Sequence, residues 1–287
     1  WGSLSLTALV KPKPPDAAPN ALPAVRPIGM GDSLRKAFHL HAFKENKTAM
    51  AEYLEPLNVV LAEGGAAKLV HSVRMMHEAN PSFVVLHLDT ANAFNELKRS
   101  AIIKRFGSIP KLKHMQRFLH ATLNPSGALV VDGEVWTEPD GVVTSDEGVT
   151  QGDPLSAAVY AVTYHEALQQ LDADCAEDGG AARAGADDVY ALATVEGALN
   201  GTKAYMKTLR VEYGLKVHPG GPGKTEIYCP TLEAIAAVER WVAAQSPDDP
   251  DYLSPAVVKG VHCYGVPMGE VSFVEDALSA KAAEVEA

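Results

Sequence analysis

The feature that most constrains the fold is a pair of acidic residues, Asp187 and Asp188, set between two strand-forming runs. Residues 181–194 (AARAGADDVYALAT) are typical of two short β-strands joined through this pair. Another strand-type run, residues 83–89 (FVVLHLD), is rich in β-branched and aromatic residues and ends in Asp89. The chain is therefore expected to build a sheet that has carboxylates at the ends of its strands.

These carboxylates need a partner. A carboxylate that follows a core strand is costly unless it is neutralised, and two adjacent carboxylates repel each other. A divalent cation would remove both problems, which predicts a metal site. The alternative is structural: Asp89 could cap the next segment, and Asp-Asp is ordinary turn chemistry.

The remaining pattern mixes helices with short strands. Asp132-Gly133 predicts a hairpin over residues 128–137, and six prolines in residues 11–27 indicate an extended lead-in. Strands and helices alternate without a regular βαβ order, which predicts an α+β sheet with its helices on one face. Periodicity predicts helices over residues 33–43, 66–79, 96–105, 110–123, 154–174 and 195–213.

Composition limits the class of protein. With 287 residues and 47% hydrophobic content, the chain can bury a sizeable core. It lacks an apolar run of about 18 residues and a signal peptide, so we expect an intracellular protein, nuclear or cytoplasmic, without a membrane anchor. The three cysteines are far apart and the ten histidines show no ligand spacing, so the sequence suggests buried thiols and no zinc site.

Charge is distributed unevenly along the chain. The net charge of −11 argues against a polyanionic partner. However, residues 26–125 carry 14 basic against 8 acidic residues, whereas residues 126–287 carry 9 against 27. This asymmetry is compatible with a nucleic acid bound along the basic half, and equally with a solvated charge pattern that has no partner.

Six short motifs resemble those of reverse transcriptases, and the non-LTR, LINE-like retroelement polymerases are the most similar group. They follow each other in the order of that family over residues 26–269, and their joint occurrence is far more specific than any single motif. The motifs are RPIGMGDSLRK (26–36), VLHLDTANAFN (85–95), EGVTQGDPLS (147–156), AGADDVY (184–190), GPGKTEIY (221–228) and YGVPMG (264–269).

The resemblance implies the fold of a right-hand polymerase. In that reading the class is α+β, with a palm made of an antiparallel sheet backed by helices, helical fingers, and no thumb. The expected fingers are residues 26–82 and 96–125, and the expected palm is residues 83–95 and 126–269. Residues 1–25 would be a poorly ordered lead-in, and residues 270–287 a tail or the start of a truncated thumb.

The resemblance also implies a two-metal nucleotidyl transfer. Asp89, Asp187 and Asp188 would be catalytic and would hold two Mg²⁺ ions, or Mn²⁺, with help from the backbone carbonyl of Thr90. Mg²⁺ suits such a site because it prefers oxygen ligands and keeps waters and substrate phosphates in its shell. The three carboxylates must then gather in one pocket, and a basic side chain that seals this pocket would count against the prediction.

Other motif residues would bind substrates. In the family, an aromatic residue at the position of Phe94 excludes a 2′-hydroxyl and so selects deoxynucleotides. Pro154 is expected to start a supporting helix that Asp153 caps. The remaining predicted nucleotide-binding residues are Arg26, Lys36, Gln151, Gly152 and Lys224, and the predicted primer grip is Gly265, Val266, Pro267, Met268 and Gly269.

The implied partners are an RNA template, a DNA primer and dNTPs. The chain departs from the pattern at Gly185, where relatives carry an aromatic residue that supports the primer terminus, and in the 18 residues after Gly269, which cannot build a thumb. We therefore expect either a piece of a longer polyprotein or a decayed, domesticated copy that binds nucleic acid without catalysis. An RNA-dependent RNA polymerase is the third reading, which Phe94 disfavours.

Overall fold

The computed structural model describes residues 4–10, 25–30, 33–123, 127–131, 134–135, 137–139, 141–142, 144–221 and 223–286. The chain divides into two compact units. Unit 1 comprises Trp1–Met50 and Phe94–Thr163, and unit 2 comprises Ala51–Ala93 and Tyr164–Ala287. Two helices, α1 (Ser33–Leu54) and α6 (Ser156–Ala176), contribute residues to both units.

Unit 2 is built on a five-stranded mixed sheet in the order β10-β11-β3-β13-β14. The first four strands are antiparallel, whereas β13 and β14 are parallel, so the sheet is not purely antiparallel as predicted. The predicted pair of strands around Asp187 and Asp188 is confirmed as the β10–β11 hairpin. The strands are β3 (Val84–Leu88), β10 (Ala181–Gly185), β11 (Asp188–Ala193), β13 (Glu226–Tyr228) and β14 (Ala256–Val258).

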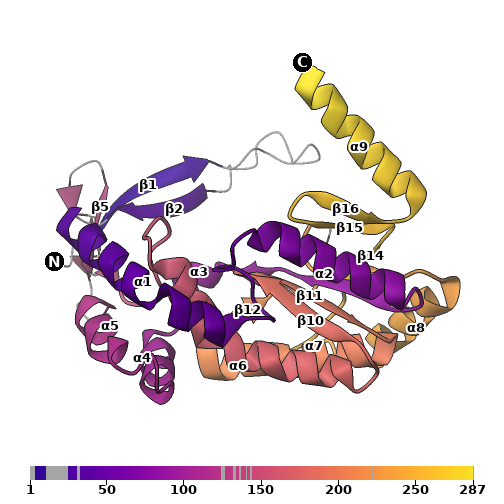
Figure 1. The fold of residues 1–287 in the computed structure, drawn as a ribbon, viewed down its shortest axis with the longest axis horizontal. Helices are drawn as coiled ribbons and strands as arrows, with labels where there is room; N and C mark the ends of the chain where they lie inside the picture. The colour runs from indigo at the N-terminus through magenta and orange to yellow at the C-terminus, as the bar shows by residue number, and fades with distance from the viewer. Residues whose placement is uncertain are drawn as a thin grey trace. The chain divides into compact units, whose positions relative to one another are not determined.

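Helices cover both faces of this sheet, which corrects the expectation of helices on one face. α2 (Gly65–Ala79) packs on β10 and β11, and α7 (Val195–Thr208) packs against β11 and β3 on the opposite face (Figure 1). The reason lies in β3, where Val85 and Leu86 point to opposite faces and both are buried. A strand that is apolar on both faces requires cover on both.

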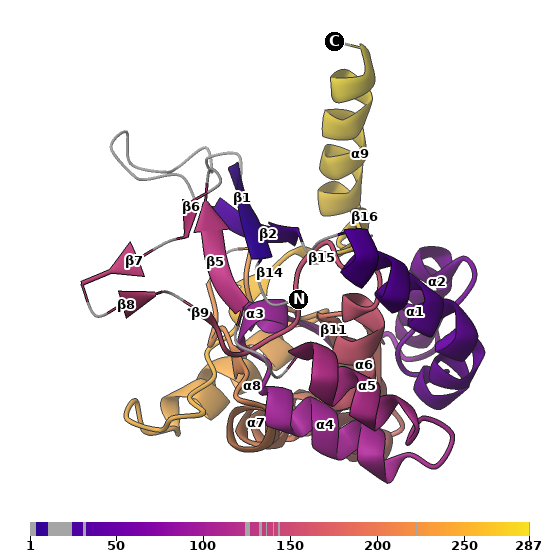
Figure 2. The same ribbon diagram turned by 90° about the vertical axis from the view of Figure 1, so that its left-hand side faces the viewer.

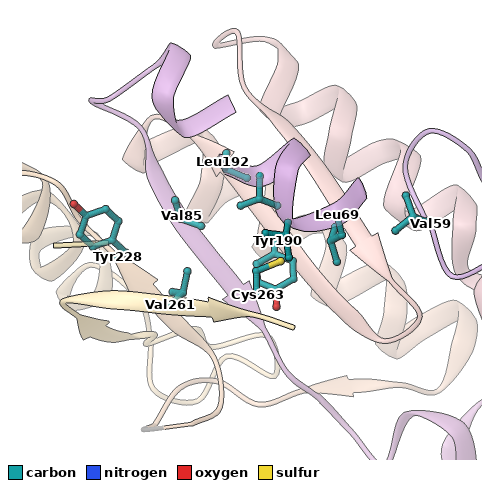
Figure 3. Packing of buried hydrophobic residues seen from close by; sticks show 10 residues of the cluster. Val59, Leu69, Val85, Tyr190, Leu192, Tyr228, Val261 and Cys263 are labelled. Atoms are coloured by element: carbon teal, nitrogen blue, oxygen red, sulfur yellow. The ribbon is translucent and has the colours of Figure 1, made fainter. Parts of the chain in front are cut away.

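One hydrophobic cluster of unit 2 lies between α2 and the sheet. Leu69, Val70 and Val73 of α2 pack with Val85 and Tyr190 of the sheet, and Val261 and Cys263 extend the cluster (Figure 3). The last two residues belong to β15 (Gly260–Cys263), which pairs with β16 (Val266–Gly269). The β15–β16 hairpin is thereby fixed to the same core as the strands that carry the carboxylates.

The smaller elements of unit 2 connect these parts. β4 (Thr90–Ala91) pairs with β12 (Lys216–Val217), and a π-helical turn (Leu209–Tyr213) continues α7, so the helix predicted to end at residue 213 is confirmed. α8 (Leu232–Ala243) packs on α7, and α9 (Val271–Glu286) packs on β16.

Unit 1 combines a second sheet with short helices. Its sheet has the order β2-β1-β5-β6 with β9 also on β5, and β1, β2 and β5 lie side by side (Figure 2). The hairpin expected about Asp132-Gly133 is present as the pairing of β5 with β6, although these two turn residues lie outside the described residues. The strands are β1 (Leu4–Val10), β2 (Val25–Met30), β5 (Gly127–Val131), β6 (Glu134–Val135), β7 (Thr137–Glu138), β8 (Gly141–Val142) and β9 (Thr144–Ser145).

The helices of unit 1 lie near the predicted positions. α3 (Ala93–Glu96) precedes α4 (Arg99–Ser108), which packs on α5 (Met115–Leu123). α4 is shifted from 96–105 by three residues, α5 begins at Met115 instead of residue 110, and α1 is longer than predicted. α1 continues to Leu54 instead of ending near residue 43, because the fully buried Met50 and Leu54 prolong its apolar face. It ends before Pro56, since a proline disfavours helical geometry in the residue that precedes it. Most of the predicted lead-in lies outside the described residues, but Leu4–Val10 within it forms β1.

Candidate active site

Three carboxylates belong to neighbouring strands of unit 2. Val189 of β11 faces Leu88 of β3, and one step further along this antiparallel register Asp188 stands beside Asp89. Asp187 occupies the adjoining two-residue turn, because Gly185 pairs with Asp188 across the β10–β11 hairpin. The backbone thus brings together the three positions that the sequence predicts to be catalytic.

The turn that carries Asp187 is held by a buried polar network. Ala186, its first residue, has a left-handed backbone with φ 58°. Asn58, only 1% exposed, donates its amide to the Tyr164 hydroxyl (2.8 Å) and to the Ala186 carbonyl (3.2 Å), and its oxygen accepts from the Ala186 amide (3.3 Å). The Tyr164 hydroxyl also donates to the Ala186 carbonyl at 2.5 Å. Asn58 and Tyr164 therefore fix the backbone next to Asp187.

A second set of contacts fixes Asp89. Its carbonyl accepts from the backbone amide of His218 (2.9 Å), and its own amide points to the Thr225 hydroxyl at 3.4 Å. The fully buried Thr225 donates this hydroxyl to the His218 carbonyl (2.6 Å). Asp89 is therefore placed by β3 and by the segments on either side of Lys224.

The Asp89 carboxylate faces two basic side chains. Lys224 Nζ lies 3.0 Å from Asp89 Oδ2, and His218 Nε2 lies 3.6 Å from the same oxygen. The side chains of Lys224 and Asp89 are 44% and 32% exposed, so the pair is partly open to solvent, although Asp89 Oδ2 itself is shielded. Partly exposed ion pairs of this kind contribute little stability.

Asp188 has a different partner. His87 Nε2 lies 3.3 Å from Asp188 Oδ1, and the His87 ring stacks on Tyr190 with ring centres 4.8 Å apart. His87 and Asp89 lie two residues apart on β3 and its extension, so they share one face of the sheet. Basic residues thus stand beside two of the three predicted metal ligands.

The carboxylates fit a divalent cation in their chemistry but not in their present side-chain positions. Asp89 Oδ2 is shielded from solvent, and the Lys224 ammonium at 3.0 Å already neutralises it, so a divalent cation would have to displace that side chain. Carboxylate and backbone oxygens are also the ligands that Mg²⁺ prefers. Within the described part of the chain, however, no three His, Cys, Asp or Glu side chains form a group that could hold a metal. The donor set fits Mg²⁺ in its chemistry and backbone placement, and Asp89 and Asp188 would have to turn away from their basic partners to bind it.

Two further predicted elements lie in unit 2. The buried Thr90 begins β4 and pairs with Val217. The predicted primer grip forms the turn and second strand of the β15–β16 hairpin: Gly265 is in the turn with φ 78°, and residues 266–269 are β16. The Tyr190 hydroxyl donates to the His262 carbonyl (3.0 Å), which attaches this hairpin to β11.

The remaining predicted site residues belong to unit 1. Phe94 starts the second segment of that unit and stacks on Tyr160, with ring centres 4.9 Å apart. Gln151 is half-buried in a turn, and Gly152 has φ 93°, which only glycine adopts without strain. Lys36 is half-buried in α1. Arg26 lies in β2, and its side chain is outside the described residues. The roles assigned to these residues stay predictions.

Asp153 holds the turn that leads into α6, which begins two residues later than predicted. Its Oδ1 accepts from the Leu155 amide (2.9 Å), while Oδ2 lies 2.7 Å from His39 Nδ1. Both side chains of this pair are almost fully buried. α6 begins at Ser156, two residues after Pro154, so Asp153 organises the approach to the helix.

Sequence reasoning missed several residues that support the site. Asn58 and Tyr164 lie in none of the six motifs, and Thr225 lies in GPGKTEIY without a predicted role, because each acts through a contact with a distant part of the chain. His87 and His218 were expected to be ordinary histidines; His87 lies in the motif of Asp89, which was the available signal, whereas His218 lies near the Lys224 motif and gave none. The structure places both beside carboxylates.

Comparisons with known proteins show the fold. Telomerase from Candida albicans, solved in complex with a TWJ fragment of telomeric RNA, is similar with a TM-score of 0.52 and 8% identity, over 95% of this chain and 44% of that one. Apo telomerase from Candida tropicalis, truncated from the C-terminal domain, gives a TM-score of 0.49 and 12% identity, over 76% of this chain and 48% of that one. The chain therefore spans less than half the length of these structures. No family model and no curated protein matches the sequence.

The predicted α+β class, with a sheet backed by helices, is confirmed. The chain is α+β, with a mixed sheet backed by helices, and it is similar in fold to telomerase. The division into fingers and palm, the missing thumb and the non-LTR assignment stay predictions. Among the described residues, no helix is both long and apolar enough to cross a membrane.

Proposed function

We propose that this chain carries the RNA-directed DNA polymerase activity of a non-LTR retroelement, adding deoxynucleotides to a primer 3′-hydroxyl under the direction of an RNA template. The observation that carries the proposal is the register of β3 and β11, which sets Asp89 beside Asp188 with Asp187 in the adjoining turn. The likeness in fold to telomerase, an enzyme related to reverse transcriptases, supports it.

The carboxylates would hold two divalent cations. Asp89, Asp187 and Asp188 are the proposed ligands for Mg²⁺ or Mn²⁺, together with the carbonyl of Thr90. When bound, the ions supply charge neutralisation at the reacting phosphate and an ordered approach for the attacking hydroxyl. The contribution of the chain is to fix the ligands, through Asn58 and Tyr164 for the turn and through Thr225 for Asp89.

Other residues would bind and orient substrates. Lys224 would direct its ammonium group to the triphosphate, and the weak pair with Asp89 keeps that group at the site. Phe94, held by its stack on Tyr160, would present a flat ring to the sugar of the incoming deoxynucleotide. Arg26 and Lys36 would bind phosphates, and Gln151 and Gly152 would lie against the template and the new base pair.

The proposal includes the setting of the protein. The partners would be an RNA template, a DNA primer and dNTPs inside the cell, in the nucleus or the cytoplasm. The telomerase chains are more than twice as long as the parts that match, so we propose that further domains of a longer polyprotein act with this one.

Primer extension tests the activity. With an RNA template, a DNA primer, dNTPs and Mg²⁺, we expect incorporation that is lost in Asp89→Asn and in Asp187→Asn. Asp276→Asn on the exposed surface of α9 changes the net charge equally and should leave incorporation intact. Equal incorporation by Asp187→Asn and the unchanged chain would refute the assignment. Preference for rNTPs over dNTPs would favour the RNA polymerase reading.

Metal binding separates an enzyme from a relic. Lys224 beside Asp89 and the small residue Gly185 are the observations that favour a domesticated, non-catalytic copy. Mn²⁺ binding can be followed by the loss of its free paramagnetic resonance signal. A catalytic site should bind Mn²⁺ in the unchanged chain and more weakly in Asp89→Asn, with Asp276→Asn as the control. If the chain binds nucleic acid but neither Mn²⁺ nor dNTPs, the relic reading is correct.

A further inference from the structure

Tyr264 stands in an unusual backbone conformation close to the carboxylates. Cys263 pairs with Val266 in the β15–β16 hairpin, so Tyr264 and Gly265 form its two-residue turn. Their φ angles are 48° and 78°. A two-residue turn of type I′ needs positive φ at both positions, and asparagine, aspartate or glycine normally fills the first. A bulky aromatic residue at this position is a true outlier, which suggests that its side chain has a use.

The side chain of Tyr264 occupies the space next to Gly185. A Cβ atom added to Gly185 would lie 2.0 Å from the Tyr264 hydroxyl oxygen and 2.6 Å from Cζ of the same ring. It would also lie 3.0 Å from Leu69 Cδ2, so the space offers no alternative direction. Gly185 therefore makes room for a phenol ring that comes from another hairpin. The aromatic residue expected at position 185 is replaced by one that arrives from position 264.

Rigid elements hold this ring. The neighbour Cys263 is fully buried against Tyr190 and Leu69 in the core of unit 2, and the Tyr190 hydroxyl binds the carbonyl of His262 (Figure 3). Gly185, on the other side of the contact, is the last residue of β10 and pairs with Asp188. The ring thus lies between two hairpins that are both anchored to one core.

The chemistry of the ring suits an uncharged part of a nucleotide. Tyr264 is 40% exposed, so a ring edge or face remains free for a ligand. Burial, then the negative charges of Asp188 and Asp187, raise the pKa of Tyr264 to about 12. The side chain is therefore a neutral aromatic with a hydroxyl donor beside the acidic pair. Aromatic rings of this kind bind bases by stacking, with little dependence on sequence.

We propose that Tyr264 contacts the terminal nucleotide of the primer strand and holds its 3′ end at the carboxylates. Gly185, which has no side chain, leaves the space that the ring occupies. This assignment rests on the proposed function, since it names the residue that positions the strand to be extended. It concerns the ring and not the hydroxyl group, so Tyr264→Phe should behave like the unchanged chain.

Binding of an RNA/DNA hybrid tests the contact without requiring catalysis. A fluorescein-labelled DNA primer annealed to an RNA template is titrated with the 287-residue chain, and anisotropy is measured. We expect Tyr264→Ala to weaken binding about tenfold, from the energy of one base stacked on an aromatic ring. Tyr264→Phe should stay within about twofold. Tyr252→Ala, which removes a tyrosine elsewhere in unit 2, serves as the control for loss of a ring.

A double-mutant cycle tests the role of Gly185. The methyl group of Gly185→Ala should push the ring of Tyr264 out of place and weaken hybrid binding about as much as Tyr264→Ala does. The double variant should bind no more weakly than either single variant, because both changes remove the same contact. Additive losses, or unchanged binding by Tyr264→Ala, would overturn the proposal, as would an unchanged chain that binds no hybrid.

Extension assays keep the two proposals separate. Tyr264→Ala should raise the KM for the hybrid about tenfold and change the KM for dNTP little, whereas Asp89→Asn should abolish extension and still bind the hybrid. If the unchanged chain binds hybrid through Tyr264 but never extends it, the polymerase proposal fails and the primer contact stands. If extension depends on Asp89 and Tyr264→Ala leaves the KM for the hybrid unchanged, the reverse holds.

Discussion

Replacing Asn58 by alanine should loosen the turn that carries Asp187. The Asn58 amide group makes four hydrogen bonds, to the Tyr164 hydroxyl, to the Val60 amide and to both backbone groups of Ala186. In Asn58→Ala the amides of Val60 and Ala186 lose their acceptor inside a site where the asparagine is 1% exposed. At about 1–2 kcal/mol for each of the two unsatisfied amides and about 1 kcal/mol for the bond to Tyr164, the free energy of unfolding should fall by about 3–5 kcal/mol.

The measurement is urea unfolding followed by the fluorescence of Trp241, which lies in α8 of unit 2. Replacing Trp1 and Trp136 by phenylalanine in every variant leaves Trp241 as the single reporter. Asn46→Ala is the matched control, since it removes a buried asparagine of unit 1 that binds Ala42 and His114. It should leave the Trp241 transition in place.

Tyr164→Phe completes the test. It removes the hydroxyl that accepts from Asn58 and donates to Ala186, and it should cost about 1–2 kcal/mol. Because Asn58 and Tyr164 share one network, the cost of the double variant should be smaller than the sum of the single costs. A loss below about 1 kcal/mol in Asn58→Ala, or strict additivity, would refute the claim that this network fixes the turn.

Three further outcomes follow from the charges and burial in unit 2. The phenol of Tyr264 should titrate near pH 12, so Tyr264→Phe should remove a late step from the absorbance titration at 295 nm. Because the pKa of this phenol is higher in the folded chain than the unfolded value near 10, the contribution of the neutral phenol to the free energy of unfolding should be lost as pH rises from about 10 to 12. The three cysteines are buried and their thiol pKa values are raised to about 11–12, so at pH 8 they should react with an aromatic disulfide reagent only after unfolding, and fast reaction of the folded chain would contradict this. Lys224→Met should tighten Mn²⁺ binding up to about fivefold by removing a weak competitor of the cation for Asp89 and should slow primer extension, with Lys224→Arg as the charge-preserving control.

The longer elements of the fold could be predicted because their signals are local. α2 begins at Gly65 and ends at Ala79, within one residue of the prediction, since its apolar residues repeat with the helical period and Pro81 follows soon after. The β10–β11 hairpin was also predicted, from two apolar runs around Asp187 and Asp188. No element was predicted after residue 213. Four strands of three or four residues lie there, each too short to show alternation, and the helices α8 and α9 were missed although they have 12 and 16 residues.

The strand-end and turn positions of the three acidic residues could be predicted, whereas the residues that contact them could not. Asp89, Asp187 and Asp188 stand at strand ends and in a turn, where a charge in an apolar stretch is conspicuous in a sequence. Lys224 lies 135 residues from Asp89, and Asn58 lies 128 residues from Ala186, so their contacts depend on tertiary structure alone. Gly185 was interpreted as the loss of an aromatic side chain, whereas the structure shows that Tyr264 fills the same space.

Backbone strain in the described residues gathers around the same carboxylates. The non-glycine residues with positive φ in that part of the chain are Asn92, Ala186 and Tyr264, at 44°, 58° and 48°. Asn92 follows Asp89 by three residues, Ala186 precedes Asp187, and Tyr264 covers Gly185 beside the acidic pair. Each left-handed residue costs on the order of 1–2 kcal/mol, which persists only where the surrounding contacts impose it. The β10–β11 hairpin, the β15–β16 hairpin and the segment after β3 each contain one of these strained residues. We therefore attribute the geometry of the acidic pair and of Tyr264 to a requirement of the site, and not to packing of the core.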